Sequence, residues 1–219
     1  FLVWSAPQPP SDSSHVWHSH PQWFMTDRYG RSTRDYTPAE CEQNGLVGAT
    51  LSPALPGVRA FVADICAEIA QNYNVDGIHL DYIRYPNPSF GYEKASVGAF
   101  FLSTGLDPLD AFRRHGGSED LSRAWSEWKK TMVTRTVETV RSVLRIHAPG
   151  VQLSCAVMAD PESAASHYSC DWRQWLEDDL VDFVCTMAYT DDTARAVELA
   201  LATTEVFPEK VVHGIGIYN

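Results

Sequence analysis

The sequence predicts an α/β protein, a TIM-type (β/α)8 barrel, incomplete in this chain and represented by about strands 3–7 of the eight. Three observations predict it. Short apolar strands alternate with amphipathic helices, an order that implies right-handed crossovers and a parallel sheet covered by helices. No GxGxxG or GxxxxGK[ST] motif follows a strand, so a nucleotide site has no support. The loops after the strands carry aromatic and acidic residues instead, which favours a barrel.

Composition restricts the function classes. The 219 residues are 44% hydrophobic and 21% charged, which is typical of a globular protein, and we expect one barrel domain over 1–219. The formal net charge of −11 argues against nucleic acid or an anionic membrane surface as a partner. No apolar run approaches the roughly 20 residues that a membrane span needs.

The first half of the chain predicts two strands, at 1–5 and 77–82, separated by a long loop over 6–50 and a helix. The helix begins near Pro56, and its apolar residues recur at helical spacing. They are Val58, Phe61, Val62, Ile65 and Ile69.

The second half predicts three more strands after a second long loop over 86–118. An apolar stripe from Leu121 to Leu144 indicates a long helix that stops before Pro149 and Gly150. Strands are expected at 151–158, 181–189 and 211–218, with helices at 172–179 and 194–204 between them. All five strands should be parallel.

The strand at 77–82 carries the main catalytic candidate. Side chains alternate along a strand, so His79 and Asp81 share one face while Ile78 and Leu80 share the other. In a barrel the apolar face packs on helices, which directs Asp81 inward at the C-terminal end, where barrel enzymes place catalytic groups. Arg84 is the local counter-charge, and a structural Asp81–Arg84 pair is the alternative.

Two further carboxylates follow strands. Asp160 and Asp191 are catalytic candidates, although an aspartate at such a place can instead cap the next helix, a role we favour for Asp192. Tyr189 lies at a strand end, well placed to bind a sugar. Glycines at the end of the last strand let a ligand or another backbone approach closely. The full set of expected substrate-binding residues is Trp4, His18, His20, Trp23, His79, Arg84, Tyr189, Tyr218 and Asn219.

The loop containing His15, His18 and His20 has a density of histidines that resembles a metal site. No carboxylate or cysteine stands at helical spacing to complete such a site, so no metal and no cofactor is expected. We expect this loop to contact substrate, with Trp17 and Trp23 stacking on sugar faces, or else to fold on itself.

The five cysteines form no CxxC pair, and their odd number defines no disulfide framework. A bridge between Cys41 and Cys170 is conceivable, and the compartment stays open.

Several segments together resemble the glycosyl-hydrolase-like 10 family of bacterial (β/α)8 proteins. They are LSPALPGVR at 51–59, NVDGIHLDYIRYP at 74–86, HPQW at 20–23, DWRQW at 171–175, VDFV at 181–184, MAY at 187–189 and GIG at 214–216. The resemblance covers nearly the whole chain. It implies that the first two strands and the last one lie outside this chain.

The resemblance also implies a function. It implies an exported (periplasmic or extracellular) glycoside hydrolase acting on a polysaccharide or a peptidoglycan-like glycan. The segment from Asp76 to Ile83 looks like the DxxDxDxE strand of chitinase-type barrels, and 187–191 like their MxYD. Ile83 stands where the chitinase general acid would be, so Asp81 must take a different role.

Three functions remain. The first is hydrolysis with Asp81 as nucleophile or base, the partner acid being Asp160, Asp191 or a residue outside this chain. The second is a non-catalytic carbohydrate-binding barrel, and the third an isomerase-type barrel enzyme acting on small metabolites. We expect one cleft to bring together Trp4, His79, Asp81, Arg84, Asp160, Tyr189 and Asn219. The sugar, the linkage and the oligomeric state are not predicted.

Overall fold

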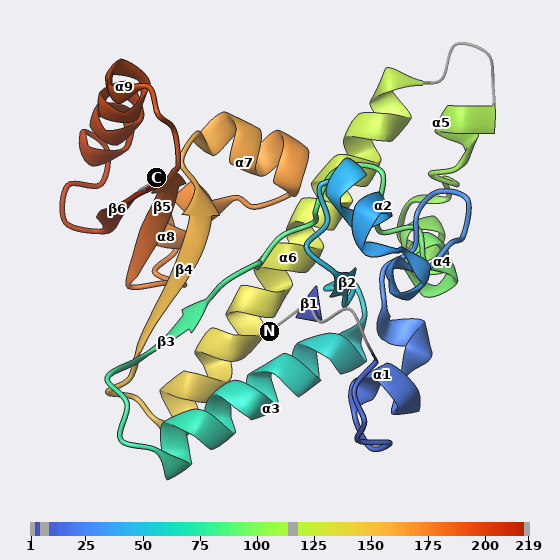
Figure 1. Ribbon diagram of the computed structural model, residues 1–219, viewed down its shortest axis with the longest axis horizontal. Coiled ribbons are helices and arrows are strands. Elements are labelled where there is room, and N and C mark those ends of the chain that lie inside the picture. The colour runs from blue at the N-terminus through green and yellow to red at the C-terminus, as the bar shows by residue number, and fades with distance from the viewer. Residues whose placement is uncertain (1–2, 5–8, 114–117, 217–219) are drawn as a thin grey trace.

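A four-stranded parallel sheet forms the centre of the structure, a computed structural model that describes residues 3–4, 9–113 and 118–216. The strands follow one another in the order β3-β4-β5-β6, and each pair is parallel. This sequential parallel order confirms the predicted α/β fold (Figure 1). The strands are β3 (Gly77–Leu80), β4 (Gln152–Met158), β5 (Phe183–Ala188) and β6 (Val211–Ile215).

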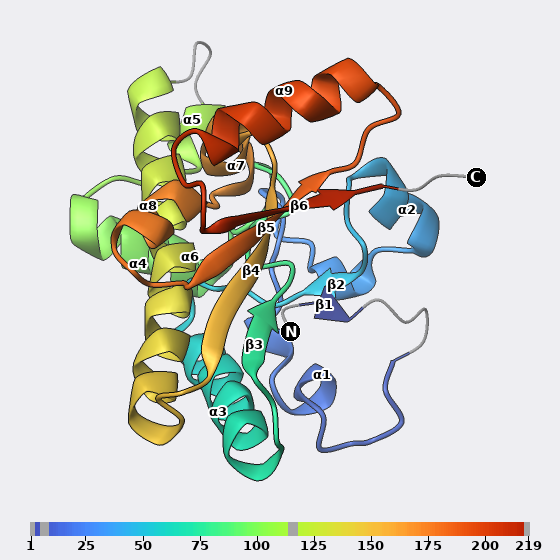
Figure 2. The ribbon, with the colours of Figure 1, turned by 90° about the vertical axis from the view of Figure 1, so that its left-hand side faces the viewer.

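Two long helices pack on each other and against the sheet. They are α3 (Pro56–Asn72) and α6 (Glu119–His147), which with α8 (Trp172–Glu177) lie on one side of the sheet in Figure 2. Val62 of α3 and Val137 of α6 lie on the predicted stripes and are buried. Burial of each such side chain stabilises the fold by about 1.5–3 kcal/mol. The helix that connects β5 to β6 is α9 (Thr193–Thr204).

The two faces of the sheet differ as the alternation predicts. Ile78 and Leu80 are buried, whereas His79 between them is exposed. In β5 the alternation continues, because Val184 is buried and Cys185 is only half-buried. The apolar face packs under the helices and the opposite face is left more open.

Strand β3 ends two residues earlier than predicted because the chain turns at Tyr82. This residue has a φ of 53°, in the left-handed region that a side chain with a Cβ rarely adopts. Asp81 Oδ1 accepts a hydrogen bond from Tyr82 N at 2.7 Å and thereby supports the turn. The chain beyond therefore leaves the sheet.

The first strand does not join the parallel sheet, so that part of the prediction is wrong. β1 (Val3–Trp4) pairs antiparallel with β2 (Ala49–Thr50) in a separate two-stranded sheet. The segment around Thr50 is already extended and fixed, since Met25 N donates to Thr50 O at 2.7 Å. Its free edge is therefore available to β1.

The two regions predicted as long loops contain short helices. Helix α2 begins with a capping box formed by Thr37 and Glu40, a local signal that sequence reasoning missed. Helix α7, after β4, was also missed. These elements are α1 (Val16–Ser19), the 3₁₀ helices η1 (Pro21–Trp23) and η2 (Thr33–Asp35), α2 (Pro38–Gln43), α4 (Lys94–Thr104), α5 (Asp110–Arg113) and α7 (Pro161–Tyr168).

An ion pair closes the N-terminal end of the sheet. Arg141 Nη2 lies 3.0 Å from Asp182 Oδ1, and Arg141 Nε donates to Leu180 O at 2.9 Å. Asp182 Oδ2 accepts from Leu153 N at 2.6 Å. These bonds connect α6 to the starts of β4 and β5.

All five cysteines are free thiols, so the conceivable Cys41–Cys170 bridge is absent. Burial raises the pKa of Cys66 to about 11 and that of Cys170 to about 12. Both are therefore protonated at neutral pH and behave as small buried hydrophobes.

Candidate functional site

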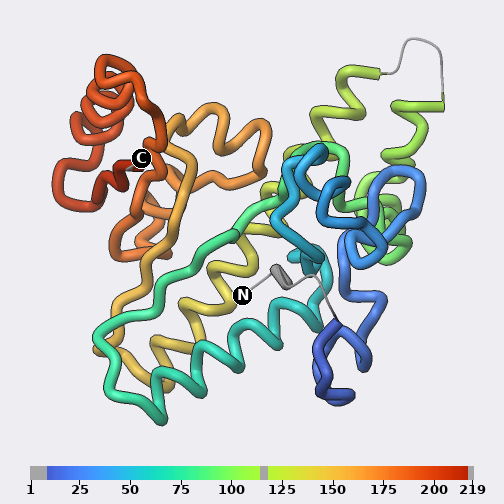
Figure 3. The backbone as a smooth tube through the Cα atoms, in the orientation of Figure 1, coloured from blue at the N-terminus to red at the C-terminus, as the bar shows by residue number. Residues whose placement is uncertain are grey.

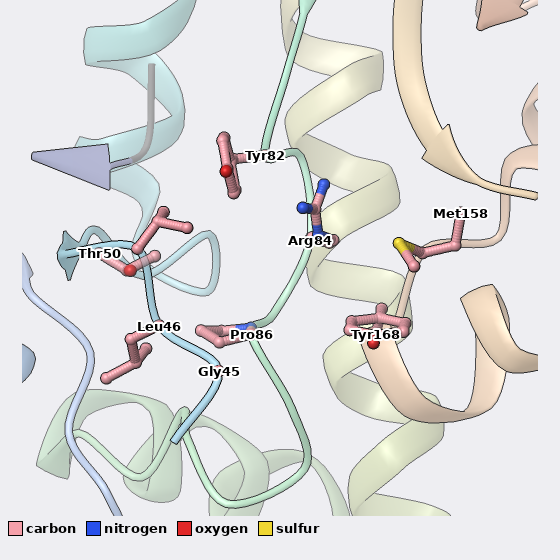
Figure 4. Close-up of a pocket in the computed structure, with 9 residues that line it drawn as sticks. Gly45, Leu46, Thr50, Tyr82, Arg84, Pro86, Met158 and Tyr168 are labelled. Atoms are coloured by element: carbon pink, nitrogen blue, oxygen red, sulfur yellow. The ribbon is translucent and has the colours of Figure 1, made fainter. Parts of the chain in front are cut away.

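A cavity of about 180 Å³ opens where β3 and β4 end. One wall comes from the segment between α2 and β2, and the other from the end of β4 and from α7 (Figure 4). The lining residues are Gly45, Leu46, Val47, Thr50, Tyr82, Arg84, Pro86, Met158 and Tyr168. We call this the Arg84 cavity.

Backbone bonds hold its walls in place. Tyr85 N donates to Tyr168 O at 2.9 Å, which ties the segment after β3 to the end of α7. Asn87 Nδ2 donates to Asn44 O at 2.7 Å, so the same segment also runs beside the end of α2 (Figure 3). The cavity is thus bounded by three segments that are far apart in the sequence.

Arg84 is the central polar group of the cavity, and its guanidinium is incompletely satisfied. The side chain is only 13% exposed, and its guanidinium lies 4.5 Å from the centroid of the Tyr82 ring. Nη1 is buried and has no hydrogen-bond partner among the described residues. A buried donor without an acceptor costs about 1–3 kcal/mol, so an acceptor from a ligand would relieve that cost.

Asp81 faces Arg84 across a gap. The distance from Asp81 Oδ1 to Arg84 Nη1 is 4.0 Å, too long for a direct hydrogen bond, and the Asp81 side chain is half exposed. A hydroxyl group between them could accept from Nη1 and donate to Oδ1. The Asp81–Arg84 pair that the sequence predicts is therefore present, but it is open.

His79 lies in β3, two positions before Asp81. One of its ring nitrogens, Nδ1, is 2.8 Å from the hydroxyl oxygen of Ser154 on the neighbouring strand β4. This contact fixes the ring orientation on the open face of the sheet, where the sequence places it.

Asp160 acts as a helix cap. Its Oδ1 accepts from Ser163 N at 2.8 Å at the start of α7, and its Oδ2 lies 3.6 Å from Arg195 Nη2. The capping alternative raised for this residue is therefore realised, and its catalytic role stays a prediction.

Asp191 and Asp192 lie in different surroundings. Asp192 caps α9 as predicted, accepting from Ala194 N at 2.9 Å. Asp191 lines a second, more open cavity of about 520 Å³ between α9 and the ends of β5 and β6, together with His213 and Gly216. Asp191 is thus not among the residues that line the Arg84 cavity.

Tyr189 is exposed beyond the end of β5. A Cβ on Gly214 would lie 3.6 Å from its ring and only 2.9 Å from Thr186 O, so glycine there allows β6 to approach β5 closely. Of the two uses foreseen for glycines at this strand end, Gly214 serves the approach of another backbone.

The histidine- and tryptophan-rich loop folds on itself. His20 stacks on Trp23 with ring centroids 3.9 Å apart, and Trp23 packs against Phe61 of α3 at 5.8 Å. His18 Nε2 lies 2.7 Å from Pro10 O. None of these three loop side chains lines the Arg84 cavity, so their sugar-binding roles remain predictions.

The remaining candidates are placed less fully. Trp4 lies in β1, next to Ala49, and Tyr218 and Asn219 lie outside the described residues. Sequence reasoning missed Tyr82, Met158 and Tyr168 of the cavity. Tyr82 and Met158 could have been found from their positions at the ends of strands, whereas Tyr168 depends on helix α7, which was not foreseen.

The described residues contain neither a candidate metal cluster nor a candidate membrane-spanning helix. In residues 3–4, 9–113 and 118–216, no group of three His, Cys, Asp or Glu side chains could hold a metal ion. Within the same ranges, no helix combines the length and the apolar character that a bilayer crossing requires.

The parallel sheet and its covering helices define a partial TIM-type barrel of the kind found in glycoside hydrolases. It resembles the PgaB (BpsB) glycoside hydrolase domain from Bordetella bronchiseptica with a TM-score of 0.63 and 16% identity, over 77% of this chain and 50% of that one. A cold-adapted β-galactosidase from Rahnella sp. R3 gives a TM-score of 0.52 at 16% identity, over 91% of this chain and 30% of that one.

The chain belongs to the glycosyl hydrolase-like 10 family, whose model matches residues 5–218. It is 22% identical over 153 residues to the glycosyl hydrolase DigH of Escherichia coli K12 and of Shigella flexneri. These matches cover 64% of this chain and 31% of the relatives, so the chain spans about a third of their length. The resemblance noted from the sequence motifs is confirmed.

Proposed function

We propose that this protein is a glycoside hydrolase that cleaves O-glycosidic bonds of a polysaccharide or a peptidoglycan-like glycan. The observation that carries the proposal is the open Asp81–Arg84 pair beside a cavity at the C-terminal end of the sheet. Barrel enzymes place their catalytic groups at this end. Family membership and the names of the relatives support the reaction class.

In this proposal Asp81 acts as nucleophile or base. The Arg84 guanidinium lies 4.0 Å from the carboxylate, and exposure of half the Asp81 side chain leaves it accessible. Arg84 Nη1 would donate a hydrogen bond to the oxygen of a sugar hydroxyl, which would supply its missing acceptor. The Tyr82 and Tyr168 rings in the lining offer surfaces for a sugar ring.

Cleavage requires a second carboxyl group as the acid, with Asp160 and Asp191 as candidates. A separation of roughly 5–5.5 Å between the two carboxyl groups would lead to retention and roughly 6.5–9.5 Å to inversion. We also propose export to the periplasm or the exterior, where such a glycan would be met.

The second candidate function is glycan binding without cleavage. It is favoured by the bonds of Asp160, whose two oxygens are engaged by Ser163 N and Arg195, and by the position of Asp191 in the other cavity. In this function no carboxyl group acts as the acid, and sugars bind through Arg84 and Tyr82 and are released unchanged.

Release of reducing sugar from a polysaccharide panel tests the proposal. We expect Asp81→Asn to lower turnover by about a thousandfold, equivalent to about 4 kcal/mol of transition-state stabilisation, and to leave the fold intact. The matched control is Asp76→Asn, an exposed aspartate before the N-terminal end of the same strand. If the turnover of Asp81→Asn stays within tenfold of the wild-type value, the proposed role of Asp81 is wrong. Glycan binding with no release by any variant would establish the binding function.

A further inference from the structure

A third cavity, of about 190 Å³, lies away from the strand ends, between α5, the first half of α6 and the segment after β3. None of its lining residues lines the Arg84 cavity. They are Pro88, Tyr92, Pro108, Ala111, Phe112, Ser122, Trp125, Ser126 and Lys129. We call this the Lys129 cavity.

Helix α6 supplies one polar stripe of the wall. Ser122, Trp125, Ser126 and Lys129 follow one another at i, i+3, i+4 and i+7, which places all four on one face of the helix. Each carries a hydrogen-bond donor. Trp125 is 3% exposed and Lys129 2% exposed, so two of these donors are deeply buried.

Lys129 is a buried ammonium without a carboxylate partner. Its Nζ donates to Pro88 O at 3.1 Å and to Phe90 O at 3.2 Å, which uses two of its three N–H groups. No ion pair to Lys129 exists among the described residues. Burial lowers the pKa of Lys129 to about 8, although the more distant Glu93 acts in the opposite direction.

Trp125 adds a second buried donor to the cavity wall. Its Nε1 is buried and has no hydrogen-bond partner among the described residues. Burial raises the pKa of the Tyr92 phenol to about 12, and the nearby Trp125 indole acts in the opposite direction. No hydrogen bond of ordinary geometry joins the indole to the phenol. The indole N–H is therefore available to an acceptor.

The lining contains no carboxylate, although the chain carries a formal net charge of −11. Asp107 and Asp110, next to the lining residues of α5, pair instead with Arg113 at 2.8 and 3.3 Å. The cavity thus combines aromatic and proline walls with hydrogen-bond donors, and no carboxylate in the lining pairs with these donors.

We propose that the Lys129 cavity binds a carboxylate carried on a single small ring. The carboxylate would accept from Lys129 Nζ and Trp125 Nε1, and the ring would pack against Tyr92 and Phe112. The volume equals that of about six water molecules, enough for one ring and one acid group. The ligand could be a free aromatic acid or a carboxylated sugar, since both offer the same chemistry.

Calorimetric titration of the chain with two matched pairs of probes tests the proposal. Benzoate against benzyl alcohol represents a free acid, and glucuronate against glucose represents a carboxylated sugar. We expect the acid of at least one pair to bind about tenfold or more tightly than its neutral partner. The pair that shows the difference identifies the source. This binding does not require hydrolysis, so its outcome is independent of that of the proposed function.

Two variants with matched controls locate the binding. Lys129→Met should weaken acid binding about tenfold or more, whereas Lys130→Met should not change it, because Lys130 pairs with Glu127 and Asp171 outside the cavity. Trp125→Phe removes only the indole N–H and part of the ring, and should weaken binding about threefold. Trp128 stacks on Trp125 but does not itself line the cavity, so Trp128→Phe should leave the affinity unchanged.

Three results would overturn the proposal. They are the absence of acid binding up to about 10 mM, equal affinity for acids and their neutral partners, and acid binding that Trp125→Phe leaves unchanged. If Lys129→Met does not fold, the wild-type selectivity and the Trp125→Phe variant still decide.

Discussion

Two aspartate–arginine pairs stand at opposite ends of the parallel sheet, and they differ in how completely the arginine is satisfied. At the N-terminal end, Arg141 and Asp182 lie 3.0 Å apart and make further bonds to the backbone. At the C-terminal end, Arg84 and Asp81 lie 4.0 Å apart, and Arg84 Nη1 has no hydrogen-bond partner among the described residues. The same two residue types are closed at one end and open at the other.

The difference separates a structural pair from a candidate functional pair. In the closed pair the two facing side chains already contact each other and the backbone, so the pair holds together the elements that it joins. An open pair keeps a donor and an acceptor available to a ligand, and it contributes little to stability because its aspartate is half exposed. Three changes test this distinction.

The largest expected effect is on the closed pair. Asp182→Ala should lower the free energy of unfolding by about 2 kcal/mol, because Arg141 and Leu153 N lose their acceptors, and partial exposure of Asp182 moderates the loss. Urea unfolding measures it. The control Asp178→Ala, at an exposed aspartate, should cost less than about 0.5 kcal/mol. Equal costs for the two variants would refute the structural role.

A smaller effect is expected at the open pair. Arg84→Lys keeps the charge but loses the planar fork, so we expect activity on a responsive glycan to fall about tenfold, or about 1.4 kcal/mol, with unfolding little changed. The control is Arg145→Lys, at an exposed position near the C-terminal end of α6. A loss of stability with unchanged activity would make Arg84 structural, like Arg141.

The smallest effect is a dependence of stability on pH. Burial raises the pKa of Asp182, but the Arg141 guanidinium and Leu153 N more than offset this, so its pKa lies below the ordinary 3.8. The ionised carboxylate therefore stabilises the fold above pH 3.8, and this stabilisation is lost as pH falls through the lower folded-state pKa. The stability difference between wild type and Asp182→Asn should narrow in acid. A difference that stays constant from pH 7 to pH 3 would contradict the assignment.

Much of the fold could be predicted because the spacing of apolar residues determines which face of a helix or strand is buried. The stripe that contains Val137 and Leu144 predicted α6, and alternation around His79 predicted both faces of β3. Helix α4 was missed because its apolar residues do not form one face: Phe100 is buried while Phe101 and Leu102 are exposed. The partner of β1 was missed because pairing of two-residue strands depends on which extended edge is nearby, a tertiary property.

The site could be predicted only in part. Asp81 and Arg84 were found because they stand three positions apart directly after a strand. The walls of the cavity could not be found, since Thr50 and Tyr168 reach it from segments more than a hundred residues apart. The unsatisfied state of Arg84 is likewise a property of three-dimensional packing that no spacing encodes.

The bond from Tyr85 N to Tyr168 O has a consequence for the speed of recognition. It ties together two segments that form walls of the Arg84 cavity, and Tyr85 itself is fully buried. A glycan would then enter a preformed cavity. Its association rate would be limited by diffusion and orientation, and binding would require no closure of the protein around it. The Tyr85 amide should accordingly exchange with deuterium as slowly in the free protein as in the glycan complex.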